Sequence, residues 1–342
     1  MQKYALKKII VIGIILITVV IGVYAKIASR SGMVPSQSKT TSTSATIPKF
    51  LRESFPKTDW LKSNPVIVNV LNGGPGKDGI PAIDAPKFVS INNFKHSNDV
   101  LTIVLQDDNS VKVYPYNILV WHEIVNDVVD NVPVSITFCP LCGSAVVYER
   151  KLQGGISTFG VSGFLLESNM IMYDRLSETL WQQSTGKALA GKYFGQELQR
   201  VSFQLLTIGE VRTKYKDASV LSEDTGYNRN YDRNPYSRYD EKEDFIFSPS
   251  LNDSSYPSKT IFVAFKVEDI PVAIPWLVIQ EGKTYQTKIN NQIISFRKEN
   301  KDLVITDDKN RIIPFYFEMW FSWAVQHQNK RIVFDPNKIN NK

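Results

Sequence analysis

Short apolar runs rich in β-branched and aromatic residues recur along most of the chain, separated by Gly, Pro, Asn and Asp. Runs of this length and composition are typical of β-strands. We expect strands at Val66–Leu71, Val100–Leu105, Val132–Phe138, Ala145–Tyr148, Thr260–Phe265 and Ile293–Phe296. Amphipathic helical patterns are scarce, and the clearest are Tyr116–Val125 and Phe315–Val325. The pattern therefore predicts a mainly β fold (α+β with few short helices) without βαβ alternation.

The first thirty residues differ from the rest of the chain. Lysines precede an apolar run from Ile9 to Ala25, and residues 1–30 contain no acidic side chain. A basic flank before such a run is typical of a signal anchor or a signal peptide. We expect an uncleaved single-pass anchor over residues 1–28, with cleavage after Val23-Tyr24-Ala25 as the alternative. Since the positive flank stays in the cytoplasm, the bulk of the chain is expected to be extracytoplasmic, at the cell membrane or secreted.

The anchor segment also accounts for the basic charge balance. The chain carries a net charge of +6, and five Lys or Arg residues lie within residues 1–30, which leaves 6 − 5 = +1 for the remainder. A nucleic-acid-binding surface needs a clustered basic excess. The composition therefore indicates a membrane partner through the N-terminal segment and no nucleic-acid partner, while a protein or small-molecule partner is not specified.

Composition divides the exported part into four segments. Residues 29–49 are rich in Ser and Thr and predict a flexible linker. Residues 50–221 predict a first β unit that contains both cysteines of the chain. Residues 222–258 are polar and tyrosine-rich, which predicts a long ordered excursion over the surface. Residues 259–342 predict a second β unit.

A short internal repeat links the two β units. The segments V-K-V-Y-P-Y-N-I-L and N-V-P-V-S-I return 160 residues later as P-V-A-I-P-W-L-V-I and N-Q-I-I-S-F. In this register Pro115 aligns with Pro275, and Asn131 aligns with Asn291. The repeat predicts two coupled, repeat-related β units. The second unit lacks counterparts of the cysteines and of His122, so function is expected in the first.

The two cysteines of the chain are the strongest chemical signal. Cys139 and Cys142 lie three residues apart in T-F-C-P-L-C-G-S. Cysteines at this spacing chelate a metal, cycle between dithiol and disulfide, or form a small structural staple. A thioredoxin-like redox motif would be followed by a helix, whereas a strand-like run follows Cys142 here. A turn between two strands is therefore expected, and this geometry favours a metal.

A histidine block lies just before the cysteines, in W-H-E-I-V-N-D. On a helix, His122 and Asn126 would share one face, and Glu123 and Asp127 the neighbouring face. The block is not the zinc-protease H-E-x-x-H, because a second histidine is missing. One imidazole and two thiolates suit zinc or copper, with a carboxylate that completes or orients the set. We therefore predict a site made of Cys139, Cys142 and His122.

A third block, Met172–Gly191, concentrates polar side chains in a short segment. It contains Asp174, Arg175, Trp181 and Gln182. Asp174 and Arg175 are interpreted either as a buried ion pair or pocket lining beside Trp181, or as hydrogen-bonded charges of a hairpin turn. Together with Glu123 and Asp127, these residues are candidates for the surroundings of the site.

These blocks, in this order, resemble an uncharacterised microbial family, the domain of unknown function 3179. The matching stretches are D-G-I-P-A-I-D-A-P-K-F, Y-P-Y-N-I-L-V-W-H-E-I-V-N-D, T-F-C-P-L-C-G-S, F-G-V-S-G-F-L-L-E-S-N-M-I-M-Y-D-R and L-W-Q-Q-S-T-G-K-A-L-A-G. The resemblance covers about Lys57 to Val333 and implies no reaction. It implies signature positions at His122, Glu123, Asp127, Cys139, Cys142, Asp174, Arg175, Trp181 and Gln182.

Three functions are therefore open from the sequence. The first is a membrane-tethered extracytoplasmic protein that binds zinc or copper through Cys139, Cys142 and His122. The second is a thiol-disulfide oxidoreductase that uses the same two cysteines. The third is a non-catalytic binding module at the cell surface, whose contact face would be the tyrosine-rich segment Tyr227–Tyr239.

Overall fold

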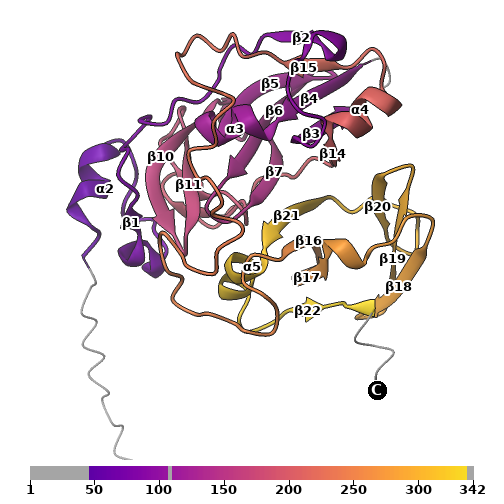
Figure 1. Cartoon of the computed structure of the whole chain (residues 1–342). Helices are drawn as coiled ribbons and strands as arrows, with labels where there is room; N and C mark the ends of the chain where they lie inside the picture. The colour runs from indigo at the N-terminus through magenta and orange to yellow at the C-terminus, as the bar shows by residue number, and fades with distance from the viewer. Residues whose placement is uncertain (1–45, 107–109, 337–342) are drawn as a thin grey trace, which may run out of the picture. The chain divides into compact units, whose positions relative to one another are not determined.

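The computed structural model describes residues 46–106 and 110–336. The predicted anchor and most of the predicted linker lie outside these residues. Within them, no helix is long and apolar enough to cross a membrane. Strands dominate and helices are few and short (Figure 1), so the predicted mainly β fold is confirmed. Residues 46–336 belong to one compact unit.

Three larger sheets and two small ones make up the fold. The first sheet has the order β1 (Leu71–Asn72), β10 (Phe159–Leu166), β11 (Asn169–Asp174), β12 (Leu180–Gln182), β13 (Ala188–Ala190). The second has the order β14 (Gln204–Thr207), β3 (Leu101–Gln106), β4 (Val111–Pro115), β15 (Ser219–Leu221), β2 (Phe88–Ser90). The third has the order β22 (Ile332–Val333), β17 (Ile270–Pro275), β16 (Ile261–Val267), β21 (Phe315–Met319), β7 (Ser144–Glu149), β6 (Val132–Cys139), β5 (Ile124–Val129). One small sheet has the order β18 (Thr284–Ile289), β19 (Gln292–Glu299), β20 (Asp302–Thr306). The other pairs β8 (Lys151–Leu152) with β9 (Gly155–Ile156).

The seven-stranded sheet contains strands from both halves of the chain. Strands β5, β6 and β7 come from the first half, and β16, β17, β21 and β22 come from the second. The halves meet where β21 pairs with β7, with Phe317 opposite Ala145. Apolar side chains of both halves then share one buried cluster, which includes Ile136, Val147 and Phe265. The cysteine turn thus lies at the strand boundary where the two halves join.

One predicted strand is wrong, and the sequence contains the reason. Val66–Leu71 forms the 3₁₀ helix η1 (Pro65–Asn69) followed by the short strand β1. Asn64 caps η1, because its side chain accepts a hydrogen bond from the Val66 backbone N–H, and Pro65 occupies the first helical position. An Asn cap followed by proline is a helix start, and here it outweighs the β-branched run.

The predicted helix Tyr116–Val125 is shorter than expected. Helix α3 (Tyr116–His122) ends where Glu123 adopts a left-handed conformation with φ 57°, and β5 follows at once. Asn126 and Asp127 therefore lie on a strand that pairs with β6. The expected helical face shared by His122 and Asn126 does not exist, because tertiary strand pairing ends the helix after His122.

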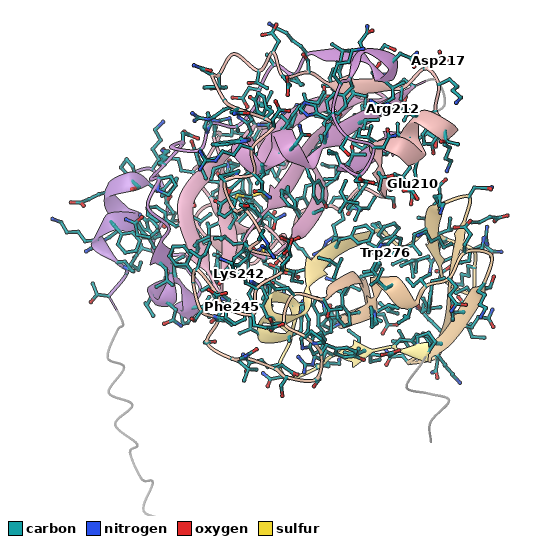
Figure 2. All side chains as sticks on the ribbon, viewed as in Figure 1. Glu210, Arg212, Asp217, Lys242, Phe245 and Trp276 are labelled. Atoms are coloured by element: carbon teal, nitrogen blue, oxygen red, sulfur yellow. The ribbon has the colours of Figure 1, made fainter. Side chains whose placement is uncertain are left out.

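The remaining helices are also short. The predicted helix Phe315–Val325 is divided into strand β21 and helix α5 (Trp320–Gln326). Helix α4 (Ile208–Lys214) begins with a capping box in which Thr207 and Glu210 exchange hydrogen bonds. Figure 2 labels Glu210 and Arg212 of this helix. The other helical elements are α2 (Lys49–Ser54), η2 (Ile91–Asn93) and η3 (Trp276–Val278). Strand pairing, rather than helix packing, is thus the main organising element.

The internal repeat has a counterpart in the order of the elements. Strands β3, β4, β5 and β6 begin at residues 101, 111, 124 and 132, and β16, β17, β18 and β19 begin at 261, 270, 284 and 292. The offsets are 160, 159, 160 and 160 residues. A helical element follows the second strand in both series, α3 in one and η3 in the other. The two segments therefore share their local element order.

Candidate functional site

The two cysteines lie in a tight turn between neighbouring strands. Cys139 is the last residue of β6 and pairs with Ser144, the first residue of β7. Gly143 has φ +56°, and a Cβ at this position would lie 3.0 Å from the Met319 side chain. The predicted strand–turn–strand context is therefore confirmed, and the turn requires glycine for both its backbone conformation and its close packing.

Polar donors surround the Cys142 sulfur. Both cysteines are free, and both are almost completely buried. The Asn169 amide donates to Cys142 Sγ over 3.0 Å, and the Ser144 hydroxyl lies 3.1 Å from the same sulfur. The Cys139 side chain also hydrogen-bonds with it. The Cys139 sulfur contacts the Ser168 carbonyl at 3.8 Å and interacts with Cys142 and with the Met170 backbone. The two sulfurs therefore have different surroundings.

This difference separates the pKa values of the two thiols. Burial alone raises the pKa of Cys142, but the hydrogen bonds from Cys139, Ser144 and Asn169 outweigh it and lower the pKa to about 7. Burial, together with the neighbouring Cys142, raises the pKa of Cys139 well above its ordinary value. At pH 7 a substantial fraction of Cys142 is thus thiolate, whereas Cys139 stays a thiol.

A network of amides fixes the donors around Cys142. The Gln183 side-chain carbonyl accepts hydrogen bonds from the Ser144 hydroxyl and from Asn169, whose amide nitrogen lies 3.0 Å away. The Gln183 amide in turn donates to Thr137 Oγ over 2.9 Å. Asn169 is held from its other side, because the Ser184 backbone N–H donates to it over 3.1 Å. The Asn169 amide group is therefore preorganised towards the sulfur.

The Ser144 hydroxyl has one proton and two possible acceptors, the Gln183 side-chain oxygen and the Cys142 sulfur. It donates to Gln183 when Cys142 is a thiol, because the thiol can then donate to the Ser144 oxygen. When Cys142 is a thiolate, the hydroxyl gains a charged acceptor, and charge-assisted hydrogen bonds are the stronger ones. Ser144 can therefore change its acceptor as Cys142 gains or loses its proton.

Two buried carboxyl groups also interact with the cysteine pair. Burial, followed by the charge of Cys142, raises the pKa of Glu123 to about 8 and that of Glu318 to about 8. Glu123 also raises the pKa of Cys139. Glu318 Oε1 accepts hydrogen bonds from Ser322 over 2.6 Å and from Gln326 over 3.0 Å. Both carboxyl groups are thus neutral acids at pH 7, which is compatible with a thiolate beside them.

His122 does not join the cysteines. Its Nδ1 lies 2.8 Å from the Pro81 carbonyl oxygen, and its Nε2 lies 2.7 Å from the Tyr231 hydroxyl. Burial lowers the pKa of the imidazole. Within residues 46–106 and 110–336 no group of three or more His, Cys, Asp or Glu side chains is arranged to hold a metal ion. The expected ligand set of Cys139, Cys142 and His122 is therefore not assembled here, because both ring nitrogens have other partners.

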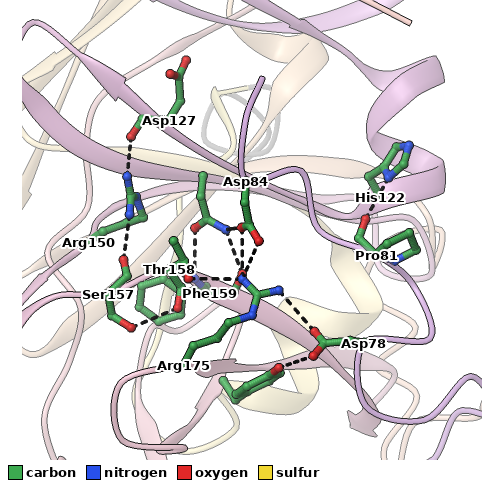
Figure 3. A network of polar contacts seen from close by, with 12 residues as sticks. Asp78, Pro81, Asp84, His122, Asp127, Arg150, Ser157, Thr158, Phe159 and Arg175 are labelled. Carbon is green, nitrogen blue, oxygen red and sulfur yellow. Dashed lines mark hydrogen bonds and ion pairs between the residues drawn. The ribbon is translucent and has the colours of Figure 1, made fainter. Parts of the chain in front are cut away.

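The predicted polar residues Asp127 and Arg175 belong to a separate network (Figure 3). The Arg175 guanidinium contacts Asp84 at 3.0 Å and Asp78 at 3.3 Å, which ties the segment before β2 to the first sheet. Asp127 accepts hydrogen bonds from Lys112 over 2.9 Å and from the Tyr114 hydroxyl over 2.7 Å. These contacts connect strands and loops, and a structural role accounts for them.

The remaining predicted residues form a hairpin arrangement. Asp174 accepts hydrogen bonds from the Ser177 backbone N–H over 2.7 Å and from the Trp181 indole over 3.1 Å. Gln182 accepts from Thr185 over 3.1 Å. Of the six residues expected around the cysteines, Glu123 is the one whose charge interacts with both sulfurs.

The residues that the sequence reasoning missed are Ser144, Asn169, Gln183 and Glu318. Each carries a polar side chain at a position that is almost completely buried. Glu318 had a readable signal, because it is the lone carboxylate in the aromatic run F-Y-F-E-M-W-F-S-W, and buried carboxylates are rare without a specific role. Asn169 opens an apolar strand and gave a weaker signal of the same kind.

A cavity of about 560 Å³ borders the cysteine turn. Pro140 and Gly143 of the turn form part of its wall. Aromatic and apolar side chains form most of the remaining lining, among them Tyr116, Phe317 and Met319. A cavity of this size and character lies within the range of small-molecule and peptide-side-chain sites.

The tyrosine-rich segment, residues 222–258, covers the cysteines, and we call it the cover. It contains no helix and no strand. Tyr239 is buried in the same apolar cluster as Cys139 and Cys142, and Phe245 packs on Phe321 with ring centroids 4.7 Å apart (Figure 2). The expectation that it forms a partner's contact face stays a prediction, and Tyr227 is its exposed aromatic residue.

Removing the Asn169 donor is expected to make Cys142 a weaker acid. Asn169→Leu keeps the side-chain size but leaves the thiolate without its 3.0 Å amide contact. Loss of a hydrogen bond to a charged group is expected to raise the pKa of Cys142 by roughly one to two units. The ultraviolet absorbance of the thiolate, followed from pH 5 to pH 10, measures this shift.

Asn126→Leu is the matched control for this experiment. Asn126 is also buried, but it hydrogen-bonds Asp84 and the Phe159 backbone rather than a sulfur. This variant is expected to lose stability without moving the thiolate titration. An unchanged pKa in Asn169→Leu would show that the amide does not stabilise the thiolate.

The fold and the site define a mainly β protein with a buried dithiol in a hairpin turn. Residues 77–313 match the family described as "Protein of unknown function (DUF3179)", and the chain belongs to this family. The resemblance predicted from the motif blocks is thereby confirmed. A search of curated proteins finds no match, and a search of solved structures finds none either.

Proposed function

We propose that Cys139 and Cys142 form a thiol-disulfide redox centre, in which Cys142 is the nucleophile and Cys139 the resolving cysteine. The observation that carries the proposal is the asymmetry of the pair. Cys142 accepts hydrogen bonds that stabilise a thiolate, and the Cys139 thiol is one of the donors. A metal site would need further ligands, whereas a redox pair needs only the two sulfurs within reach of each other.

The first step is an attack by the Cys142 thiolate on one sulfur of a substrate disulfide. A bond forms between Cys142 Sγ and that sulfur, and the substrate S–S bond breaks. The other substrate sulfur leaves as a thiolate, and the neutral carboxyl of Glu123 can protonate it. Glu123 suits this role because its pKa of about 8 keeps the proton available near neutral pH.

The second step releases the substrate. The Cys139 thiol passes its proton to the Glu123 carboxylate and attacks Cys142 Sγ, so that the Cys139–Cys142 bond forms and the second substrate sulfur leaves as a thiolate. Two electrons pass from the dithiol to the substrate disulfide. The Cys139 proton replaces the one that Glu123 gave up, so the carboxyl returns to its starting state.

Access to the sulfurs requires movement of the cover. Cys139 and Cys142 are 1% and 0% exposed. The cover lies over them without a regular element, and such segments open locally at lower free energy than paired strands do. Opening of the cover is therefore part of the proposed cycle. We further propose that the N-terminal segment, residues 1–28, holds this centre outside the cytoplasm, where disulfides persist.

A redox titration of the purified chain tests the proposal. The protein is equilibrated with mixtures of reduced and oxidised dithiothreitol, quenched with acid, and its free thiols are counted by mass spectrometry. We expect one transition from two free thiols to none. The ratio of reduced to oxidised protein should change tenfold for about every 30 mV, as for a two-electron couple. A pair that stays fully reduced across the series contradicts the proposal.

Elemental analysis of the same sample tests the metal alternative. Zinc or copper in a one-to-one ratio, lost in Cys139→Ser, would favour a metal site at the two cysteines over the redox centre. We expect no stoichiometric metal, because His122 is engaged by Pro81 and Tyr231 rather than directed to the sulfurs.

A further inference from the structure

The cavity beside the cysteine turn indicates which class of substrate the proposed redox centre acts on. It shares Pro140 and Gly143 with the turn, so a molecule held in it lies against the turn that contains both cysteines, although the cysteines themselves do not line it. Its lining combines residues of the seven-stranded sheet, such as Phe317 and Met319, with residues of the cover, such as Tyr236 and Tyr239. A ligand in this position would contact the sheet, the turn and the cover at once.

The charges of the lining do not select an anion. The wall contains three carboxylates, Asp99, Asp232 and Asp240, and two cations, Arg233 and Lys259. Their net charge is 2 − 3 = −1. Lys259 is also engaged already, because its ammonium lies 3.5 Å from the centre of the Tyr239 ring and donates to the Asp244 carbonyl over 2.8 Å. A small disulfide with several carboxylates would meet no free cluster of cations here.

Two polar groups of the lining residues have unused hydrogen-bonding capacity. Among the described residues, Asn117 Oδ1 is buried without a donor, and the buried Tyr239 hydroxyl has no acceptor for its proton, although the Ile246 backbone N–H interacts with its oxygen. The Asn117 amide is oriented, because its nitrogen donates to the Tyr231 carbonyl over 3.3 Å, which leaves its oxygen as an acceptor. A buried polar atom without a partner lowers stability, so a ligand that supplies the missing partner gains affinity.

A peptide unit supplies both missing partners. Its N–H can donate to Asn117 Oδ1, and its C=O can accept from the Tyr239 hydroxyl. The apolar lining then suits an aromatic or aliphatic side chain of the same peptide. Both atoms are buried in the closed structure, so a peptide reaches them as the cover, which contains Tyr239, moves.

We propose that this cavity binds a peptide segment with an apolar side chain next to a cysteine, so that the redox centre acts on peptide or protein disulfides. This inference rests on the proposed function for its purpose, but binding can be measured without any redox step. A small anionic disulfide is the alternative source of the same sulfur chemistry, and the experiment separates the two.

The probe is the blocked tripeptide acetyl-alanyl-phenylalanyl-S-methylcysteine amide, which cannot exchange disulfides. Its dissociation constant is measured by calorimetry with the full chain. We expect binding that weakens about tenfold in Tyr239→Phe and about tenfold in Asn117→Leu, because each change removes one buried hydrogen bond. Tyr239→Phe keeps the ring packing, so it tests the proposal even where Asn117→Leu disturbs the fold.

Tyr285→Phe is the matched control. The Tyr285 hydroxyl donates to the Val278 carbonyl, and Tyr285 does not line the cavity. This variant is expected to bind the tripeptide as the unchanged protein does. S-methylglutathione, the anionic probe, is expected to bind at least tenfold more weakly than the tripeptide.

Three outcomes overturn the inference. They are no binding of the tripeptide, equal binding by Tyr239→Phe and Asn117→Leu, or binding of S-methylglutathione as tight as that of the tripeptide. A chain that binds the tripeptide but does not oxidise reversibly would keep this inference and refute the redox function. A chain that oxidises reversibly but does not bind the tripeptide would keep the redox function and refute this inference.

Discussion

Cys142→Ser is expected to abolish the exchange of this protein with a peptide disulfide, a loss of more than about 100-fold, because the attacking thiolate is gone. Cys139→Ser is expected to retain the first step and to accumulate a mixed disulfide between Cys142 and the peptide. The two cysteines differ in this way because the Asn169 amide and the Ser144 hydroxyl contact the Cys142 sulfur at 3.0 and 3.1 Å, whereas burial and the neighbouring Cys142 raise the pKa of Cys139. Mass spectrometry after acid quenching measures both products.

The rate of this first step should follow the ionisation of Cys142. Its pKa of about 7 means that the reactive form is the deprotonated one and that its fraction rises about tenfold between pH 6 and pH 8. Above pH 8 the rate should level off, because nearly all Cys142 is then thiolate. A rate that continues to rise tenfold per pH unit through pH 9 would indicate an ordinary thiol.

The opposite pattern of the two variants would reverse the assignment. Mixed disulfide that accumulates in Cys142→Ser, and not in Cys139→Ser, would make Cys139 the nucleophile. Equal loss in both variants, with no trapped species, would remove the exchange mechanism altogether. Circular dichroism of each variant separates these outcomes from a loss of folding.

Arg150→Met is expected to lower the free energy of unfolding by roughly 3–5 kcal/mol, the largest stability effect that we predict. The Arg150 guanidinium is buried and donates to three backbone carbonyls, those of Val134 at 2.9 Å, Ser157 at 2.8 Å and Asp127 at 2.9 Å. Figure 3 shows the contacts with Ser157 and Asp127. Methionine fills a similar volume but leaves these three carbonyls without donors. Urea denaturation measured by tryptophan fluorescence gives the difference.

Arg297→Met is the control for the loss of an arginine as such. Arg297 lies on β19, is 51% exposed, and has a contact of 3.4 Å with Glu299. This variant is expected to stay within about 0.5 kcal/mol of the unchanged protein. A loss below about 1 kcal/mol in Arg150→Met would show that water can replace the guanidinium at its carbonyls.

Local patterns predicted much of the fold. The runs at Val132–Phe138 and Ala145–Tyr148 form strands, and the cysteines lie in the turn between them, as their flanks indicated. The offset of 160 residues reappears in the order and start points of the strands. Such features depend on neighbours within a few residues, so the order of residues in the chain already contains them.

The same patterns failed where distant pairing competed with local preference. Tyr116–Val125 has a helical pattern, yet Ile124 and Val125 pair with β6, and the helix ends at His122. Distant neighbours likewise decide the role of Arg150, whose guanidinium donates to three carbonyls from separate segments. Neither outcome is visible without knowledge of which strands become neighbours.

The candidate site, like the fold, depends partly on local sequence and partly on contacts between distant segments. The sequence alone predicted that two cysteines of one turn are the chemical centre of the chain and that they follow an N-terminal membrane segment. Only the tertiary structure decided which groups surround them: Asn169 and Gln183 from later segments, and Glu318 from the second half of the chain. It also decided that His122 lies against Pro81 and Tyr231. The physical reason is that a thiol's pKa depends on burial and on donors within about 3 Å, and the fold brings such a donor to Cys142 from Asn169, a residue of another strand.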